Sequence, residues 1–482
     1  MRVLFASSEY YPLMKTGGLA DVSASLPAAL HSLEVDIRVV IPAYRDALER
    51  ALVYGVKVIL ATTFNGYGIR ILETKLPEAR HPVWMLDCPA LFDRPGSPYQ
   101  DDTSGSEYPD NADRFGLLSA VTAALALGKL SIDWRPELLH INDWQVALAA
   151  AWIKDQPERP PVLFTIHNLA YQGVFDRAAF DRLGLPNELW HPDSLEFYGQ
   201  FSFIKAGLTF SDHVSTVSPS YAEEIQTAAF GCGLEGVMQR RRHNLSGILN
   251  GIDTRFWNPA TDPALAATYS PTQLDRKHLN KTALQAELGL DPDPQTPLFA
   301  FIGRLAEQKG IDLLIDVIPG LMALGAQIAI QGTGSRALAA KLEELAATNR
   351  GRVAFTDAYS ENRAHRIEAG ADIFLMPSRF EPCGLNQLYS MRYGTVPVVR
   401  AVGGLRDTVI DTTDATIEDR TATGFCFDDD SSDALFTAAC AAVDRYRDQE
   451  CWRQIQLNGM RKDFSWQSSA SRYVRLYEQM LA

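Results

Sequence analysis

The sequence predicts an α/β protein in which strands and helices alternate through two halves of the chain. Short apolar runs of strand-forming residues are followed by segments whose apolar residues recur with helical spacing. The loops between a strand and the next helix carry glycines and polar side chains, and ligands of open parallel sheets bind at this edge. At 482 residues the chain is too long for one core, so we expect two or three domains.

The clearest strand–loop–helix unit covers residues 371–399. An apolar strand at 371–376 precedes a loop that contains Glu381, and the helical spacing that follows stops at Gly394, as at a helix C-cap. The next strand is expected at 396–399. The loop places a carboxylate, a thiol and glycine amides above a helix N-terminus, where amides suit an anion. We therefore expect Glu381 to face a bound group that is either anionic or becoming cationic.

The N-terminal half opens with a strand at 3–6, a Lys15-Thr-Gly-Gly loop and a helix from Gly18 to His31. A strand, a glycine pair and a helix form a layout that can cradle a phosphate, with Lys15 as a cation beside the amides. The spacing is not that of a Walker loop. A tight turn with a solvent-exposed lysine explains the pattern equally well.

Polar side chains follow two later strands of this half. A strand at 138–141 leads to Asp143, and a strand at 161–166 leads to His167 and Asn168. A histidine at a strand end is more often a hydrogen-bonded structural residue. Several polar strand ends in one half of the chain weaken that alternative and favour a ligand site.

The other predicted elements of this half keep the alternation. Further strands are expected at 35–41, 83–86 and 213–217, and helices at 111–130 and 219–227. The loop at 92–99 is rich in turn-forming residues, and its Tyr99 has a ring suited to stacking on a sugar.

The C-terminal half restarts the alternation with a strand at 298–302, which leads through Arg304 and Lys309 to a helix at 311–324. Two cations beside amide-rich loops suit a pyrophosphate, because arginine holds oxygens bidentately while lysine acts as a compact charge. If the pyrophosphate is a leaving group, these cations stabilise the charge that grows on it. Two unrelated surface cations after a strand are the alternative.

A glycine pattern at 332–337, after a strand at 326–331, matches a dinucleotide-binding fingerprint, and Asp357 lies at the distance expected of a ribose-binding acid. A dehydrogenase is therefore an alternative function, and it predicts nicotinamide binding. Because this strand is the second of its half, we interpret the glycines as a turn near a phosphate. A strand at 353–356 then leads to Tyr359.

The domain organisation follows from these elements. The chain crosses into its second half near Asn250, so we expect domains at 1–249 and 250–460, with a cleft between them. Residues 461–482 include an amphipathic helix with an aromatic apolar face, which we expect to pack back on the first domain.

The net charge and the cysteines argue against several kinds of partner and site. The formal net charge of -14 argues against nucleic acid or an anionic membrane as the main partner. No uncharged run reaches transmembrane length, and the first residues lack a signal-peptide pattern. The six scattered cysteines indicate reduced thiols in a cytoplasm, without a zinc site or disulfide framework. With no convincing metal-ligand set in the sequence, we expect Arg304 and Lys309 to act without a metal.

Five strings along the chain resemble those of one enzyme family. They are Lys15-Thr-Gly-Gly-Leu, His167-Asn-Leu-Ala-Tyr-Gln-Gly, Asn250-Gly-Ile-Asp, Gly303-Arg-Leu with Lys309-Gly, and Ser378-Arg-Phe-Glu-Pro-Cys-Gly-Leu. In this order they resemble the bacterial glycogen synthases and the related plant starch synthases over essentially the whole chain. The resemblance implies the GT-B glycosyltransferase fold, two facing Rossmann-like domains with the last helix returning to the first. It also implies transfer of glucose from ADP-glucose to the non-reducing end of an α-1,4-glucan, glycogen or a maltooligosaccharide, with retention of configuration and without metal or other cofactor.

The same resemblance assigns roles to particular residues. It implies that Arg304 and Lys309 hold the diphosphate, and that Glu381 binds the glucose hydroxyls. It implies that Asp143 and His167 surround the transferring sugar together with Asn250. It further implies substrate contacts at Lys15, Gly18, Asn250, Tyr359 (against adenine), Cys383, Gly384 and Leu385. Asp21, Tyr99, Asn168 and Asn386 are further candidate substrate-binding residues.

Three positions depart from the family pattern. Tyr389 stands where related retaining transferases place a second acid, Asn142 where the family usually has histidine, and Asn386 where threonine is common. With no second carboxylate placed to attack the sugar, our hypothesis is a front-face displacement in which the departing phosphate takes the acceptor's proton and a backbone carbonyl near His167 steadies the sugar. A non-catalytic glucan- or nucleotide-binding protein, another retaining transferase, and a uracil-based donor remain alternatives.

Overall fold

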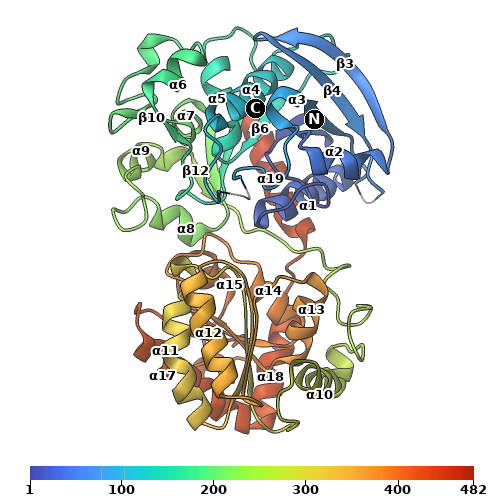
Figure 1. The fold of residues 1–482 in the computed structure, drawn as a ribbon, viewed down its shortest axis with the longest axis vertical. Coiled ribbons are helices and arrows are strands. Elements are labelled where there is room, and N and C mark those ends of the chain that lie inside the picture. Colours follow the sequence, from blue (N-terminus) through green and yellow to red (C-terminus); the bar gives the residue numbers. More distant parts are fainter. Residues whose placement is uncertain (78, 102–103) are drawn as a thin grey trace. The chain divides into compact units, whose positions relative to one another are not determined.

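The structure is a computed structural model. It describes residues 1–77, 79–101 and 104–482. These residues form two compact units, of which unit 1 joins Met1–Gly251 to Trp466–Ala482 and unit 2 is Ile252–Ser465 (Figure 1). Each unit contains its own largely parallel sheet with helices packed against it, so the prediction of two α/β halves is confirmed.

Unit 1 is built on a nine-stranded sheet in the order β12-β11-β7-β6-β1-β2-β5-β4-β3. Its strands are β1 (Arg2–Ala6), β2 (Asp36–Pro42), β3 (Val56–Phe64), β4 (Tyr67–Thr74), β5 (Val83–Asp87), β6 (Leu138–Asn142), β7 (Val162–Ile166), β11 (His213–Thr216) and β12 (Leu245–Gly247). Within the described part of this sheet, β4 pairs antiparallel with both β5 and β3, and the remaining pairs are parallel. The central strands β6 and β7 are buried at every residue, as expected of parallel strands covered on both faces.

The β3–β4 hairpin at one edge of this sheet is absent from the predicted elements. Asn65 and Gly66 form its turn, and both have positive φ, 49° and 81°, as the two-residue turns favoured by Asn-Gly require. The edge strand β3 is exposed or half-buried along its whole length. Its apolar residues therefore form no buried run that the sequence pattern could reveal.

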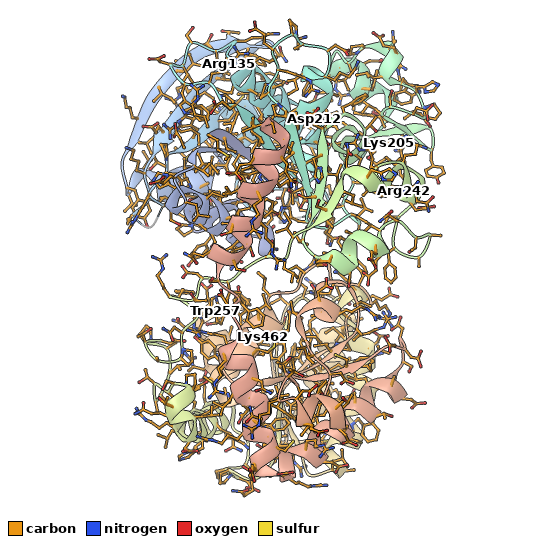
Figure 2. The ribbon with its side chains drawn as sticks, turned by 180° about the vertical axis from the view of Figure 1, so that it is seen from behind. Arg135, Lys205, Asp212, Arg242, Trp257 and Lys462 are labelled. Atoms are coloured by element: carbon orange, nitrogen blue, oxygen red, sulfur yellow. The ribbon has the colours of Figure 1, made fainter. Side chains whose placement is uncertain are left out.

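Helices and a small sheet complete unit 1. The helices are α1 (Gly18–Ser32), α2 (Arg45–Leu52), α3 (Pro89–Phe92), α4 (Asn111–Ala126), α5 (Trp144–Ile153), α6 (Arg177–Arg182), α7 (Phe203–Phe210), α8 (Pro219–Glu224) and α9 (Glu235–Arg240). The small sheet contains β8 (Val174–Phe175), β10 (Gln200–Ser202) and β9 (Glu196–Phe197). Arg159 forms a bidentate ion pair with Asp212, which ties the start of β7 to the start of β11 (Asp212 is labelled in Figure 2).

The last helix, α19 (Trp466–Leu481), belongs to unit 1 and packs against α1, as Figure 1 shows in red and blue. Its apolar face, including Tyr473 and Tyr477, is buried in the unit 1 core. The Tyr477 hydroxyl lies 2.7 Å from Nδ1 of the buried His140 in β6. The aromatic face that the sequence shows thus packs against the central sheet of unit 1.

Unit 2 is built on a six-stranded parallel sheet in the order β15-β14-β13-β16-β17-β18. The strands are β13 (Leu298–Ile302), β14 (Gln327–Gln331), β15 (Val353–Thr356), β16 (Ile373–Met376), β17 (Val396–Arg400) and β18 (Phe425–Phe427). The helices are α10 (Lys277–Leu288), α11 (Ile311–Ala323), α12 (Arg336–Thr348), α13 (Glu361–Gly370), α14 (Asn386–Arg392), α15 (Gly403–Thr408), α16 (Asp414–Glu418), α17 (Ser432–Arg447) and α18 (Gln449–Arg461). Helix α14 ends before Gly394, whose φ is +67°, as the predicted C-cap requires.

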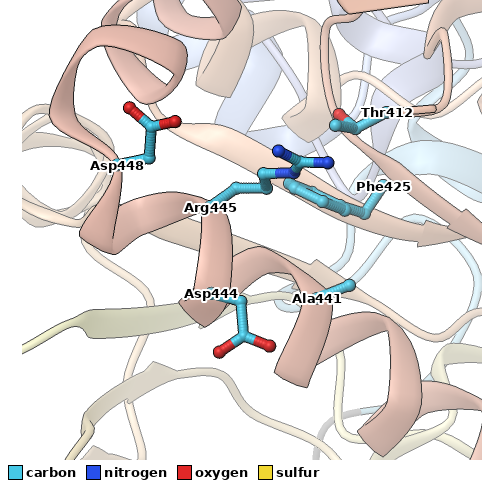
Figure 3. A pocket seen from close by; sticks show the side chains of 6 residues that line it. All are labelled: Thr412, Phe425, Ala441, Asp444, Arg445 and Asp448. Carbon is cyan, nitrogen blue, oxygen red and sulfur yellow. The ribbon is translucent and has the colours of Figure 1, made fainter. Parts of the chain in front are cut away.

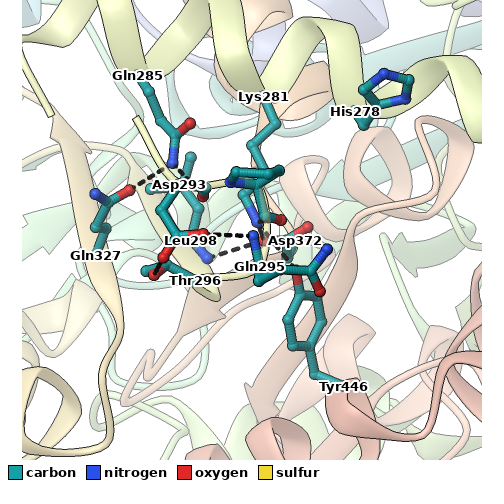
Figure 4. A network of polar contacts seen from close by, with 12 residues as sticks. His278, Lys281, Gln285, Asp293, Gln295, Thr296, Leu298, Gln327, Asp372 and Tyr446 are labelled. Atoms are coloured by element: carbon teal, nitrogen blue, oxygen red, sulfur yellow. Dashed lines mark hydrogen bonds and ion pairs between the residues drawn. The ribbon is translucent and has the colours of Figure 1, made fainter. Parts of the chain in front are cut away.

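A buried polar network lies at the amino ends of β13 and β16 (Figure 4). Lys281 of α10 reaches Asp372 at 2.7 Å and also donates to the hydroxyl of Tyr446. The Asp372 carboxylate accepts the backbone N–H of Leu298 at 2.9 Å. Because this network sits at the strand ends opposite the ligand-binding edge of such sheets, we assign it a structural role in fastening α10.

Candidate active site

The loop after β1 is organised by Glu9, which is not among the candidate site residues. Its buried carboxylate accepts the backbone N–H of Thr16 at 2.7 Å and that of Gly17 at 3.3 Å, and the hydroxyls of Thr16 and Tyr99 at 2.5 and 2.6 Å. The chain's own carboxylate therefore uses two amides of the expected phosphate cradle. Lys15 pairs with Asp21 at 2.9 Å. A polar residue just past a buried strand is the signal that points to Glu9.

Tyr99 helps to hold this loop in place. Besides donating to Glu9, its hydroxyl lies 2.8 Å from the Ser8 hydroxyl, and its ring packs against Phe115 at a centroid distance of 5.8 Å. Burial, with the charge of Glu9 next, raises the pKa of Tyr99 well above its usual value. Its hydroxyl is therefore committed inside unit 1, and the expected stacking on a sugar stays a prediction.

The second part of the site in unit 1 joins the ends of β6 and β7. Asp143 has a positive φ of 59° and precedes α5, and its Oδ1 accepts the backbone N–H of His167 at 2.7 Å. Burial raises the pKa of Asp143 to about 7, although backbone N–H groups of His167 and Asn168 oppose the shift. Burial lowers the pKa of His167 to about 3, so its ring is neutral at ordinary pH. The Asp143 carboxyl thus holds the His167 loop in place.

Replacing Asp143 with asparagine tests this buried carboxyl. Its folded pKa of about 7 exceeds the unfolded value near 3.8, so the folded state keeps a proton that the unfolded chain has released. The stability this proton contributes is present below about pH 4 and is lost as pH rises through 7, by up to about 1.4 kcal/mol per unit. Urea unfolding should show the stability of the native chain falling relative to Asp143→Asn over this window. Asp193→Asn, at an exposed aspartate, is the control, and parallel curves for Asp143→Asn and the native chain contradict the assignment.

In unit 2 the loops after β13 and β16 meet through Lys309 and Glu381. Nζ of Lys309 lies 2.6 Å from Oε2 of Glu381, which also accepts the hydroxyl of Ser378 at 2.9 Å. The Glu381 side chain is only 8% exposed, so the ammonium compensates a nearly buried carboxylate. The sequence assigns these residues to separate roles, and the structure shows one ion pair.

Arg379 holds the same two loops together; it lies within the Ser378-Arg-Phe-Glu string, but the sequence assigned it no role. Its guanidinium holds Asp312 bidentately at 2.8 and 2.7 Å and donates to the carbonyl of Glu307 at 2.7 Å. Its backbone N–H donates to the carbonyl of Gln308 at 2.8 Å. These bonds position the backbone on both sides of Lys309, so the ion pair with Glu381 rests on a rigid frame.

The loop from Glu381 to α14 is supported by α15. The backbone N–H of Gly404 donates to the carbonyls of Glu381 and Pro382 at 3.0 and 3.2 Å. Cys383 is buried, and Gly384 has a φ of +71°. The side chain of Asn386 donates to the carbonyl of Ile302 at 2.7 Å, so its amide group joins this loop to the end of β13.

A methyl group at Gly404 should disturb this loop. An alanine Cβ at Gly404 lies 2.1 Å from the Cys383 carbonyl oxygen and 2.4 Å from its Cα, and backbone atoms cannot yield as a side chain can. Gly404→Ala should displace Glu381 and lower kcat by about a hundredfold, the cost of a misplacement of about 1 Å. Gly236→Ala, where a Cβ meets nothing within 4 Å, is the matched control. Unchanged initial rates for Gly404→Ala contradict this role.

The glycine pattern at 332–337 has a packing explanation. A Cβ at Gly332 lies 2.1 Å from the carbonyl oxygen of Gly303, and one at Gly334 lies 2.6 Å from that of Leu305. The backbone N–H of Ser335 donates to the same Leu305 carbonyl at 2.9 Å. The glycines therefore permit close contact with the loop of Arg304, which removes the main support for a dehydrogenase.

The remaining candidates occupy separate positions. In unit 1, Gly18 begins α1, Asn168 accepts the backbone N–H of Ala170 at 3.0 Å, and the Oδ1 of buried Asn250 has no hydrogen-bond partner among the described residues. In unit 2, Arg304 donates to Gln308 at 3.4 Å, and Leu385 immediately precedes α14. Tyr359 is 54% exposed.

Tyr389, at the position of the missing second acid, is partly buried and packs against the unit 2 core. Its ring stacks on Trp257 at a centroid distance of 3.7 Å, and the ring of His365 stacks on Trp257 at 3.8 Å (Trp257 is labelled in Figure 2). The tyrosine thus replaces a possible ligand with an apolar contact.

A cavity of about 370 Å³ lies elsewhere in unit 2 (Figure 3). It is lined by Thr412, Phe425, Ala441, Asp444, Arg445 and Asp448. None of the candidate site residues lines it. Within the described ranges, no three His, Cys, Asp or Glu side chains gather as metal ligands, and no helix there is long and apolar enough to cross a membrane.

Known proteins resemble this chain along its whole length. A family model described as starch synthase catalytic domain matches residues 2–240, and one described as glycosyl transferases group 1 matches residues 285–449. The chain is 52% identical to glycogen synthase 1 of Methylococcus capsulatus, with 100% of this chain and 97% of that protein covered. It is 50% identical to glycogen synthase of Marinobacter nauticus, with 100% and 98% covered.

Solved structures agree. The catalytic domain of starch synthase IV from Arabidopsis thaliana, bound to ADP and acarbose, matches with a TM-score of 0.88 and 32% identity, covering 100% of this chain and 99% of that chain. Sucrose-phosphate synthase from Thermosynechococcus elongatus matches with a TM-score of 0.61 and 17% identity, covering 99% and 98%, which bears on the fold alone.

Two Rossmann-like units and these matches define a glycosyltransferase of the GT-B fold, as expected. Within that class the units correspond to a starch synthase catalytic domain followed by a group 1 transferase domain. The chain belongs to the glycogen synthase family and is an enzyme of glycogen biosynthesis. The resemblance drawn from the five sequence strings is thereby confirmed.

Proposed function

We propose that the enzyme transfers glucose from ADP-glucose to the non-reducing end of an α-1,4-glucan, with retention of configuration and release of ADP. The observation that carries this proposal is the Lys309–Glu381 pair at the carboxyl end of the unit 2 sheet, held on loops that Arg379 fastens. A cation and a hydrogen-bonding carboxylate at one point suit a sugar joined to a diphosphate. The ADP and acarbose bound to starch synthase IV support a nucleotide donor and a glucan-like acceptor.

On the donor side, Arg304 and Lys309 neutralise the diphosphate, and Glu381 accepts hydroxyls of the glucose. The charge on the leaving group grows in the transition state, so preorganised cations act where catalysis needs them. Tyr359, with its largely exposed ring, contacts the adenine. Lys15 and Gly18 of unit 1 contribute further donor contacts, and no metal takes part.

On the sugar side, His167 and Asn250 contact the glucose, and Asp143 orients the His167 loop. Glu9 and Asp143, the two carboxylates at the strand ends of unit 1, already accept backbone N–H groups of the loops that follow. This suits groups that hold a loop in place better than it suits a nucleophile. A front-face displacement needs neither: the departing phosphate oxygen takes the acceptor's proton, and a backbone carbonyl beside His167 steadies the oxocarbenium-like sugar.

Labelled donors test the proposal. Purified enzyme with glycogen and a chelator should incorporate glucose from ADP-glucose into the polymer and release equal ADP. UDP-glucose should react more slowly, and NMR of a maltooligosaccharide product should show a new α-linkage. Loss of activity in the chelator, a β-linkage, or preference for UDP-glucose each contradicts one part of the proposal.

The compartment is part of the same proposal. None of the six cysteines, all within the described residues, forms a disulfide. Thiols that stay reduced suit the cytoplasm, where we propose the enzyme works.

A further inference from the structure

Asn142 is the last residue of β6 and is fully buried. Its side chain makes two contacts. Nδ2 donates to the carbonyl oxygen of Ala6 in the neighbouring β1 at 3.1 Å, and Oδ1 lies 3.0 Å from Nε2 of His167. The residue therefore joins the ends of three strands beneath the His167 ring.

The first contact decides which way the amide points. A backbone carbonyl can only accept a hydrogen bond, so the group facing Ala6 must be the NH2 of Asn142. Its oxygen must then face His167, and an amide oxygen can only accept. The hydrogen of the neutral imidazole must therefore be on Nε2, which leaves Nδ1 of His167 as the acceptor nitrogen.

The second step concerns the charge of the ring. Burial lowers the pKa of His167 to about 3, and the amide that meets Nε2 carries no charge. Of the nearby titratable groups, Asp143 bonds the backbone N–H of His167, and His140 is committed to Tyr477 and Thr165. Among the described residues, the amide contact at Nε2 is therefore what selects between the two neutral forms of the ring.

We propose that Asn142 is a positioning residue that locks His167 in the form protonated on Nε2 and so presents Nδ1 to the substrate as a hydrogen-bond acceptor for a sugar hydroxyl. The consequence for catalysis rests on the proposed function; the protonation itself does not. A histidine at position 142 could donate or accept toward His167, whereas the amide fixed by Ala6 can only accept.

The test reads protonation directly. NMR of enzyme labelled with 15N-histidine, without substrate, should show the His167 hydrogen on Nε2, with the signal assigned by its loss in His167→Gln. Asn142→Leu keeps the side chain's size and removes both contacts. It should mix the two ring forms and lower kcat about tenfold, the effect of one net hydrogen bond, while KM for ADP-glucose stays within about twofold.

Two more variants complete the design. Asn142→Asp keeps an acceptor opposite Nε2 and should retain the Nε2 hydrogen, which keeps the proposal testable if Asn142→Leu fails to fold. Asn244→Leu is the control, because this exposed asparagine of unit 1 also donates to a backbone carbonyl, that of Asp212. It should change neither the spectrum nor kcat.

The outcomes separate the two proposals. A His167 hydrogen on Nδ1 in the native enzyme overturns the inference. So does Asn142→Leu with an unchanged spectrum, whatever its kcat, because the amide then does not select the form. Failure of the native enzyme to transfer glucose overturns the proposed function and leaves the NMR result standing.

Discussion

Replacing Lys309 with alanine is expected to lower kcat about a hundred- to a thousandfold, the range seen when one preorganised group that stabilises transition-state charge is removed. The substitution has two effects on the site. It takes a cation from the proposed diphosphate site, and it leaves the Glu381 carboxylate, only 8% exposed, without its ion-pair partner at 2.6 Å. Initial rates at saturating glycogen and varied ADP-glucose measure the effect.

Two further variants show which property of Lys309 matters. Lys309→Arg keeps the charge but not the compact shape, so it should recover part of the rate. Lys341→Ala removes an exposed lysine in α12 and should leave the rate unchanged. A kcat of Lys309→Ala within a factor of about two of the native value would contradict the proposal that Lys309 stabilises the charge on the departing diphosphate.

Replacing Glu9 with alanine is expected to have the second-largest effect. The change leaves the N–H groups of Thr16 and Gly17 and the hydroxyl of Tyr99 without their acceptor. Because Thr16 and Gly17 are exposed, water can take over part of this role, so the loss should lower the free energy of unfolding by about 1 to 2 kcal/mol. Because the Lys15 loop then loses its anchor, kcat/KM should fall about a hundredfold. Urea unfolding and initial rates report the two quantities.

The comparison variants for Glu9 separate anchoring from charge. Tyr99→Phe removes only one of the donors and should cost less in both measurements. Glu49→Ala removes an exposed acid of α2 in the same unit and should change neither. A Glu9→Ala enzyme as stable and active as the native one shows that the loop holds its shape without the carboxylate.

Most of the strands that pattern predicts are largely buried by tertiary packing, although β15 is predicted and only partly buried. Strand β7 (Val-Leu-Phe-Thr-Ile) is apolar at four of its five positions and buried at all of them, as expected of a parallel strand covered on both faces, whereas the equally buried β6 also carries His140 and Asn142. The edge strand β3 faces solvent, and its residues are chosen by pairing with β4 rather than by burial. The Asn65-Gly66 pair between two strand-forming runs is the sequence signal that could have found this hairpin.

In the candidate site, too, the sequence indicates some residues but not the contacts that they make. Asp143, His167, Lys309 and Glu381 could be named because each lies in a loop that follows a strand. The hydrogen bonds and ion pairs that these residues make could not be predicted from the sequence. Glu9 meets Tyr99 across 90 residues, and Lys309 meets Glu381 across 72. Such distances along the chain carry no periodic signal, so Glu9, Arg379 and the role of Asn142 emerged only when the strand ends were in place.

By itself, the sequence determined that this protein has two α/β halves, which loops end at the ligand edge, and which enzyme family it belongs to, because burial and close backbone contact constrain residue type locally. Only the tertiary structure decided which groups neutralise and orient one another. A hydrogen bond or ion pair depends on distances of about 3 Å, which folding sets and the order of residues does not display.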